Sequence, residues 1–170
     1  MSNAAVRRPL SLWRFAGWGL IALLLSIPAI FRWPWTGSDF VIMGLLLGSV
    51  GLGVEFLARL SGSVFVRLGA IMAVLTAFLT IWVNLAVGMI GDDEVYNLLF
   101  VIPMGLVLAS GLASRLRPAA MVKASLLAAG LQAAIGLGGY GMDPRGAILS
   151  ASFALFWLFA AALFRAGVSR

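Results

Sequence analysis

The feature that most constrains this chain is a run of uncharged, mostly apolar residues long enough to cross a membrane as one helix. The run from Leu68 to Ile90 contains no charged residue, and about 20 apolar residues span the hydrocarbon core of a bilayer. Further apolar runs follow one another through the sequence, separated by short loops. Because the bilayer core offers no partners to backbone polar groups, these runs are predicted to form α-helices.

Six segments meet the length criterion, at least approximately, and they predict a single transmembrane domain over residues 1–170. The predicted fold is an all-α, polytopic helical bundle. The fifth segment is the least apolar, because it contains Lys123 and Gln132 and is rich in alanine and glycine. Five spans therefore stand as the alternative to six. The predicted spans cover residues 15–31, 40–58, 68–90, 95–113, 121–138 and 147–164.

Composition excludes a water-soluble globular domain. Hydrophobic residues make up 62% of the chain and charged residues only 11%, whereas ordinary soluble domains carry about 25% charged residues. The chain has no cysteine and no histidine, which removes disulfides, zinc sites built on these residues and nucleophiles activated by imidazole. The sequence shows neither paired acids at membrane depth nor a glycine-rich phosphate loop. We therefore expect no enzymatic activity, no cofactor and no metal site.

The distribution of charge predicts the orientation, because short loops rich in Lys and Arg stay in the cytoplasm. With six spans and both termini cytoplasmic, ten basic residues lie inside and only Arg32 and Arg145 lie outside. Without the fifth span the division is nine to three. This placement explains the net charge of +6 without nucleic acid, and it predicts contact with anionic lipid headgroups on the cytoplasmic side. The inner basic residues are Arg7, Arg8, Arg14, Arg59, Arg67, Arg115, Arg117, Lys123, Arg165 and Arg170.

Aromatic residues and prolines mark the helices further. Trp18 lies near the inner end of the first predicted span, while Trp33 and Trp35 lie at its outer end, where indole rings prefer the membrane interface. Pro28 and Pro103 fall inside predicted spans. Each is expected to kink its helix, because proline removes one backbone hydrogen bond.

One face of the second predicted span carries small and charged residues in helical spacing: Gly44, Gly48, Gly51, Glu55 and Arg59. The glycines are expected to let a neighbouring helix approach closely. Glu55 precedes Arg59 by one turn, which favours a local ion pair that reaches the cytoplasmic interface. The alternative is a proton or cation site, since ionisable groups within spans are costly and often functional.

Two amides and an acidic turn form the other candidate site. Asn84 and Gln132 each lie about 9 Å below the outer end of their spans at 1.5 Å per residue, so a hydrogen bond between them is predicted to hold the helices together. A small polar pocket beneath the turn Asp92, Asp93 and Glu94 is the sharper alternative. Three adjacent acids can ligate a divalent cation, but a solvated loop is the favoured interpretation of this turn.

Two stretches of the sequence carry a family resemblance. Residues 82–91 read Trp-Val-Asn-Leu-Ala-Val-Gly-Met-Ile-Gly, an acidic turn and Asn97-Leu98 follow, and residues 115–118 read Arg-Leu-Arg-Pro. They resemble a family of small proteobacterial inner-membrane proteins, in which a helix ending in Asn-Leu-Ala-Val-Gly leads into an acidic turn containing Asn and Pro, and an Arg-x-Arg-Pro turn closes the following helix. Here the acidic turn lacks the proline. The resemblance covers about a quarter of the chain, and it implies a multi-helix protein of a bacterial inner membrane and no particular activity.

Three classes of function therefore remain open. The first is a non-enzymatic accessory or scaffold protein that packs through its glycine faces against another membrane protein or a second copy of itself. The second is a small transporter or channel, with a polar path at Asn84 and Gln132 and at Glu55 and Arg59. The third is a binder of an apolar ligand such as a lipid, quinone or carotenoid, which requires no special residues.

Overall fold

The computed structural model describes residues 12–60 and 63–168, and of residues 12–13 and 57–60 it describes the backbone alone. Helices and connecting turns account for all of these described residues, among which no strand occurs. The chain divides into two compact units, unit 1 up to Glu55 and unit 2 from Phe56. The all-α prediction is thereby confirmed, and each unit is described by itself below.

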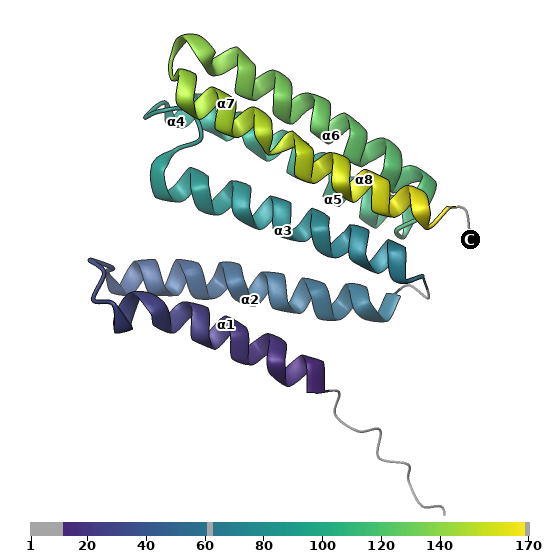
Figure 1. Ribbon diagram of the computed structural model, residues 1–170, viewed down its shortest axis with the longest axis horizontal. Coiled ribbons are helices and arrows are strands. Elements are labelled where there is room, and N and C mark those ends of the chain that lie inside the picture. Colours follow the sequence, from purple (N-terminus) through teal and green to yellow (C-terminus); the bar gives the residue numbers. More distant parts are fainter. Residues whose placement is uncertain (1–11, 61–62, 169–170) are drawn as a thin grey trace, which may run out of the picture. The chain divides into compact units, whose positions relative to one another are not determined.

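Unit 1 is built on a helical hairpin. Helix α1 covers Leu12–Ile30 and helix α2 covers Gly37–Leu60, with the unit boundary near the end of α2 (Figure 1). A reciprocal cap starts α2: the carboxylate of Asp39 accepts from the backbone N–H of Thr36 (2.6 Å), and the Thr36 hydroxyl accepts from that of Asp39 (3.4 Å). This arrangement satisfies donors that a helix start otherwise leaves without partners.

Unit 2 contains four long apolar helical segments, which lie along one another as a bundle (Figure 1). The segment formed by α6 packs against α5, α7 and α8, and α8 also packs against α3. Aspartates and prolines set several helix starts: Asp143 caps α7, and Pro118 and Pro144 occupy first turns, where the missing N–H costs nothing. The elements are α3 (Val64–Val87), α4 (Glu94–Asn97), η1 (Leu98–Phe100), α5 (Val101–Ser114), α6 (Pro118–Gly138), η2 (Gly139–Gly141), α7 (Pro144–Ser152) and α8 (Ala154–Ala166).

The core of unit 2 combines small residues with a few large aromatic side chains. Ala128 of α6 and Ala160 of α8 are fully buried, as is Phe164, and Trp157 is 1% exposed. Gly69 of α3 lies so close to the Phe164 ring that an added Cβ would stand 3.0 Å from it. Small residues at helix contacts let the backbones approach, and the aromatic rings fill the space that remains.

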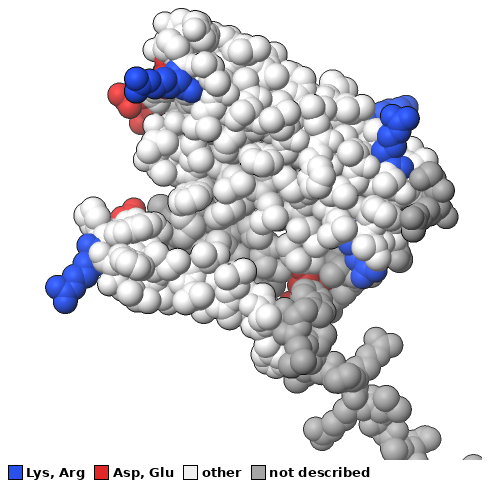
Figure 2. Space-filling view, viewed as in Figure 1, with Lys and Arg blue, Asp and Glu red and all other residues white. Residues whose placement is uncertain are grey.

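Five helical segments are long and apolar enough to cross a membrane, which confirms a polytopic membrane protein as the class of fold. The fifth predicted span, the least apolar in sequence, is one of them. The apolar part of α1, Arg14–Ile30, is shorter, so the count of six spans stays a prediction. On the face shown in Figure 2, charged side chains lie near helix ends and the surface between them is uncharged. The five segments are Gly37–Phe56, Val64–Val87, Glu94–Ser114, Pro118–Gly141 and Pro144–Ala166.

One detail of the predicted helices is wrong, and another is seen only in part. The third span was expected to continue to Ile90, but α3 ends at Val87, because Gly88 adopts a φ of 72° that stops the helix. The fourth span was expected to kink at an internal Pro103. The 3₁₀ turn η1 interrupts this helix just before Pro103, which lies in the first turn of α5, and the bend itself stays a prediction.

Candidate functional site

The loop that follows α3 folds back into unit 2, and residues 88–91 are called the plug loop below. Met89 is 1% exposed and Ile90 is fully buried. Their side chains pack in an apolar cluster with Phe100, Ala147 and Phe153. A loop placed inside a bundle must find partners for its backbone polar groups, and several side chains of unit 2 supply them.

Asn97, at the end of α4, makes most of these bonds. Its Oδ1 accepts from the backbone N–H of Met89 (3.1 Å) and of Ile90 (2.8 Å). Its Nδ2 donates to the carbonyl oxygens of Gly91 (3.1 Å) and Ile90 (3.4 Å). Asn97 is 7% exposed. One buried amide therefore satisfies four backbone groups of the plug loop.

Asn84, predicted as a site residue, serves the same loop. Its Oδ1 accepts from the Met89 N–H (3.2 Å), and its Nδ2 donates to the backbone carbonyl of Asn97 (2.9 Å). The predicted hydrogen bond between Asn84 and Gln132 is not formed. Gln132 donates instead to the carbonyl of Ser150 (3.3 Å), and its buried Oε1 has no hydrogen-bond partner. The Asn84 amide thus binds backbone groups that are close to it in sequence. The prediction considered only the depth of the two amides in the membrane, and depth does not show such local partners.

Ser150 of α7 and Asp143, the residue that caps α7, make the remaining side-chain hydrogen bonds to the plug loop. The Ser150 hydroxyl donates to the Met89 carbonyl (3.0 Å), and Asp143 accepts from the Gly91 N–H (3.2 Å). The backbone N–H of Gly146 donates to the Asp143 carboxylate. This bond holds the pKa of Asp143 below its usual value against the opposing effect of desolvation, and bonds from Gly91 and Arg145 act in the same direction.

Beside the plug loop lies a surface hollow of about 490 Å³, called the acidic hollow below. Asp92 and Glu94 line it together with the exposed apolar side chains of Leu85, Val87 and Leu98. Asn84 also lines it and Gln132 does not, so the polar pocket predicted from these two amides beneath the acidic turn stays a prediction. The full lining is Asn84, Leu85, Ala86, Val87, Gly88, Gly91, Asp92, Glu94, Asn97 and Leu98.

The acidic turn does not gather its carboxylates around one point. Asp93 caps α4, since its Oδ1 accepts from the Tyr96 N–H (2.9 Å), while Asp92 and Glu94 lie exposed along the hollow. Within the described residues, no group of three or more acids is placed to hold a metal ion. A solvated loop remains the interpretation of these acids.

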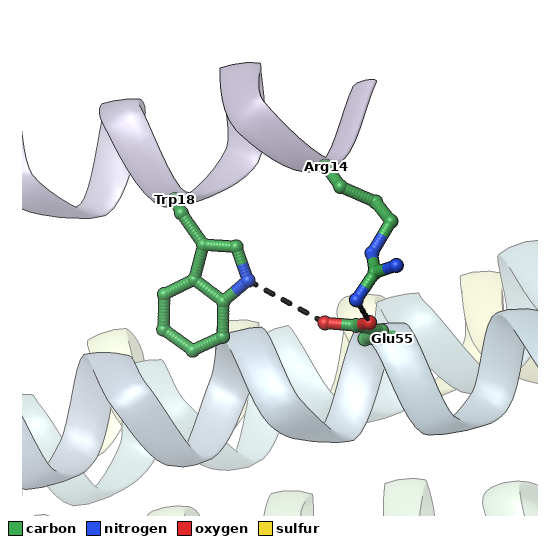
Figure 3. A network of polar contacts seen from close by, with 3 residues as sticks. All are labelled: Arg14, Trp18 and Glu55. Carbon is green, nitrogen blue, oxygen red and sulfur yellow. Dashed lines mark hydrogen bonds and ion pairs between the residues drawn. The ribbon is translucent and has the colours of Figure 1, made fainter. Parts of the chain in front are cut away.

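In unit 1, three side chains meet between α1 and α2 (Figure 3). Arg14 of α1 forms an ion pair with Glu55 of α2, and the Trp18 indole N–H points at the same carboxylate at 3.4 Å. The side chain of Glu55 is 14% exposed and that of Arg14 is 37% exposed. The side chain of Arg59 lies outside the described residues, so the Glu55–Arg59 pair stays a prediction.

The glycine face of α2 is used unevenly. A Cβ at Gly51 would lie 2.7 Å from the end of the Ile21 side chain and 3.2 Å from the Trp18 ring, so α1 and α2 approach closely here and an added Cβ would displace these side chains. A Cβ at Gly44 would make an ordinary contact of 3.7 Å with Leu25, and one at Gly48 would meet nothing within 4 Å. The close approach predicted for this face is therefore made within the hairpin at Gly51, and it involves side chains of α1.

Sequence reasoning overlooked Asn97, Ser150 and the pairing of Arg14 with Glu55. The pairing had a signal, because Arg14 directly precedes the first predicted span and Glu55 lies near the end of the second, which places both at one depth. For Asn97 the sequence held a weaker signal, namely its position beside the acidic turn. For Ser150 the sequence held no signal, because its hydrogen-bond partner lies 61 residues away.

Comparison with known proteins adds no relationship to this geometry. No protein-family model, curated protein or solved structure gives a significant match to the chain.

Proposed function

We propose that the protein is a non-enzymatic accessory protein of a bacterial inner membrane, which docks a partner membrane protein. The observation that carries the proposal is the plug loop. Asn84, one of the four polar residues considered for a transport path, is hydrogen-bonded to two backbone groups, the Met89 N–H and the Asn97 carbonyl. Gln132, the second, donates to the Ser150 carbonyl. These bonds favour a fixed, packed helix end over a polar route through unit 2.

The acidic hollow is the proposed docking surface. Leu85, Val87 and Leu98 are 63%, 71% and 65% exposed, and the carboxylates of Asp92 and Glu94 lie beside them. An apolar helix of a partner, with a basic residue at the membrane interface, matches this combination of surfaces. The resemblance of residues 82–91 and 115–118 supports the bacterial inner membrane as the location.

The test is gentle extraction of the tagged protein from its native membrane, followed by native mass spectrometry and an absorbance spectrum. We expect a second protein in a fixed ratio to this chain. Leu98→Trp fills the acidic hollow and should release that companion. Leu112→Trp is the matched control, because Leu112 is similarly exposed (71%) on the same apolar segment, Glu94–Ser114, but does not line the hollow.

Three results would contradict the proposal. Recovery of the chain alone, as a monomer or homo-oligomer, would favour transport. A visible chromophore on the isolated chain would establish an apolar ligand. A companion that both tryptophan variants retain would place the docking surface elsewhere.

A further inference from the structure

Unit 1 contains a cavity of about 160 Å³ beside the Arg14–Glu55 ion pair. One end of the cavity is polar and carries both charges and the Trp18 indole, and the remaining walls are aliphatic or glycine. An apolar cavity of this size admits a group as large as benzene, which corresponds to a short stretch of one acyl chain. The lining residues that form the aliphatic walls are Ile21, Val50 and Val54.

The polar end of this cavity offers both signs of charge. The Arg14 guanidinium has five N–H donors, and its Nε is buried in the structure without a hydrogen-bond partner. The Glu55 carboxylate, which accepts from Arg14 and Trp18, brings a negative charge to the same end of the cavity. A ligand that carries a phosphate and an ammonium on one short linker complements these two side chains.

The position of the cavity matches a lipid headgroup. Arg14 is at the start of the apolar part of α1, and Glu55 is near the end of the apolar segment of α2. Trp18 is 39% exposed one turn from Arg14, and indole rings prefer this depth of the membrane. The cavity therefore lies where headgroups meet the first methylenes of their acyl chains.

We propose that unit 1 binds one phospholipid with a zwitterionic headgroup that contains a primary ammonium, namely phosphatidylethanolamine. Its phosphate accepts hydrogen bonds from Arg14, its ammonium donates to Glu55, and part of one acyl chain occupies the cavity beside Ile21 and Val54. Phosphatidylcholine has the same charges but no ammonium hydrogen to donate. An anionic headgroup such as phosphatidylglycerol brings no cation to Glu55. The proposal is independent of the accessory role, which concerns unit 2.

The experiment offers the purified full-length protein an equimolar mixture of phosphatidylethanolamine, phosphatidylcholine and phosphatidylglycerol with identical acyl chains, and measures retained lipid by native mass spectrometry. We expect one lipid per chain, with phosphatidylethanolamine retained about fivefold over phosphatidylcholine, since hydrogen bonds in bilayers are modest. Equal retention of these two lipids, or a preference for phosphatidylglycerol, would overturn the proposed headgroup.

Two glycines of α1 provide a matched pair for the cavity. Gly17 lines it and Gly19 does not, and a Cβ at either position would meet nothing within 4 Å. Gly17→Leu should fill the cavity and reduce retained lipid about fivefold or more, while Gly19→Leu should leave retention unchanged; both raise helix propensity equally. Equal retention by the two variants would exclude the cavity as the acyl site.

Glu55→Gln tests the headgroup separately. It preserves the shape of the side chain and removes the charge that attracts the ammonium. We expect the preference for phosphatidylethanolamine over phosphatidylcholine to fall to about one, because the charge-assisted bond is lost, with total retained lipid above that of Gly17→Leu. An unchanged preference in Glu55→Gln would refute the role of Glu55.

Discussion

A single amide, that of Asn97, holds both polar groups of Ile90 as well as the Met89 N–H and the Gly91 carbonyl. Satisfying buried backbone groups matters more than the mean strength of a hydrogen bond, because each group left without a partner costs its desolvation energy. At the scale of the residue, stability near the plug loop should therefore follow the number of backbone groups that each side chain satisfies.

Asn97→Ala should lower the free energy of unfolding by about 2–4 kcal/mol, since it leaves several buried groups unsatisfied. Asn84→Ala, which removes two bonds in a partly buried site, should cost about 1–2 kcal/mol. Ser26→Ala is the control, because the exposed Ser26 hydroxyl bonds only within its own helix, and it should change stability by less than about 0.5 kcal/mol. Unfolding by SDS in mixed micelles measures all three. A loss at Asn97 no larger than at Ser26 would refute the fastening role.

Asp143 predicts a dependence of stability on pH. Its folded pKa lies below the ordinary value of 3.8, with the Gly146 N–H as the largest cause. The carboxylate therefore contributes stability that is complete above 3.8 and is lost as the pH falls through the lower, folded pKa. Unfolding of the wild type and of Asp143→Asn should be compared between about pH 6 and pH 2. The wild type should lose stability relative to the variant at the acid end; parallel curves would contradict the prediction.

At the scale of the element, two turns define how the helices of unit 2 end. The plug loop follows α3 at Gly88, and the second turn places Arg115 and Leu116 at φ of 49° and 59° before Pro118 begins α6. The Leu116 N–H closes this turn on the Gly111 carbonyl (3.0 Å). Both turns lie within the motifs that carry the family resemblance, so in this chain the motifs form the turns that end α3 and α5.

The contact between α6 and α7 depends on Gly136. A Cβ there would lie 2.6 Å from the backbone nitrogen of Ala151, and backbone cannot move aside as a flexible side chain can. Gly136→Ala should therefore reduce stability by about 1–3 kcal/mol. Gly130→Ala on the same helix meets nothing within 4 Å and should be neutral or stabilising by up to about 1 kcal/mol. Thermal unfolding in detergent distinguishes them, and equal midpoints would show that α6 and α7 adjust freely.

Sequence reasoning predicted the helices well and the plug loop poorly, for a physical reason. Length and apolar character alone determine which segments can span, so the fifth segment was identified despite Lys123 and Gln132. The path of residues 88–91 depends on partners such as Asn97 and Ser150, and apolar periodicity carries no information about them. Met89 and Ile90 are as apolar as the helix before them, which is why the predicted third span ran through to Ile90.

At the scale of the whole molecule, the absence of cysteine from the sequence makes the membrane topology directly measurable. Any cysteine introduced by mutation is the only thiol in the protein. A membrane-impermeant maleimide therefore reports the side of the membrane on which that residue lies. Exposed positions for such cysteines lie at helix ends, among them Ser38 in the first turn of α2 and Gly141 at the end of η2.

Six spans with cytoplasmic termini predict a clear labelling pattern. Ser38→Cys and Gly141→Cys should react in intact cells, whereas Ser2→Cys should react only after permeabilisation. The reason is that ten basic residues favour retention of their loops in the cytoplasm. If Ser2→Cys and Ser38→Cys react from the same side, α1 does not span. If Ser38→Cys and Gly141→Cys react from opposite sides, the number of crossings between them is odd.

The plug loop also imposes an order on biosynthesis. A ribosome makes residues 88–91 well before Asp143 and Ser150, whose side chains bind Gly91 and Met89. During that interval Asn84 and Asn97 are the loop's nearest partners along the chain. The hydrogen bonds of the plug loop are therefore completed only after the last helical segment has been made. A chain that stops before Asp143 presents Met89 and Ile90 beside backbone groups that still need partners, in place of a finished helix end.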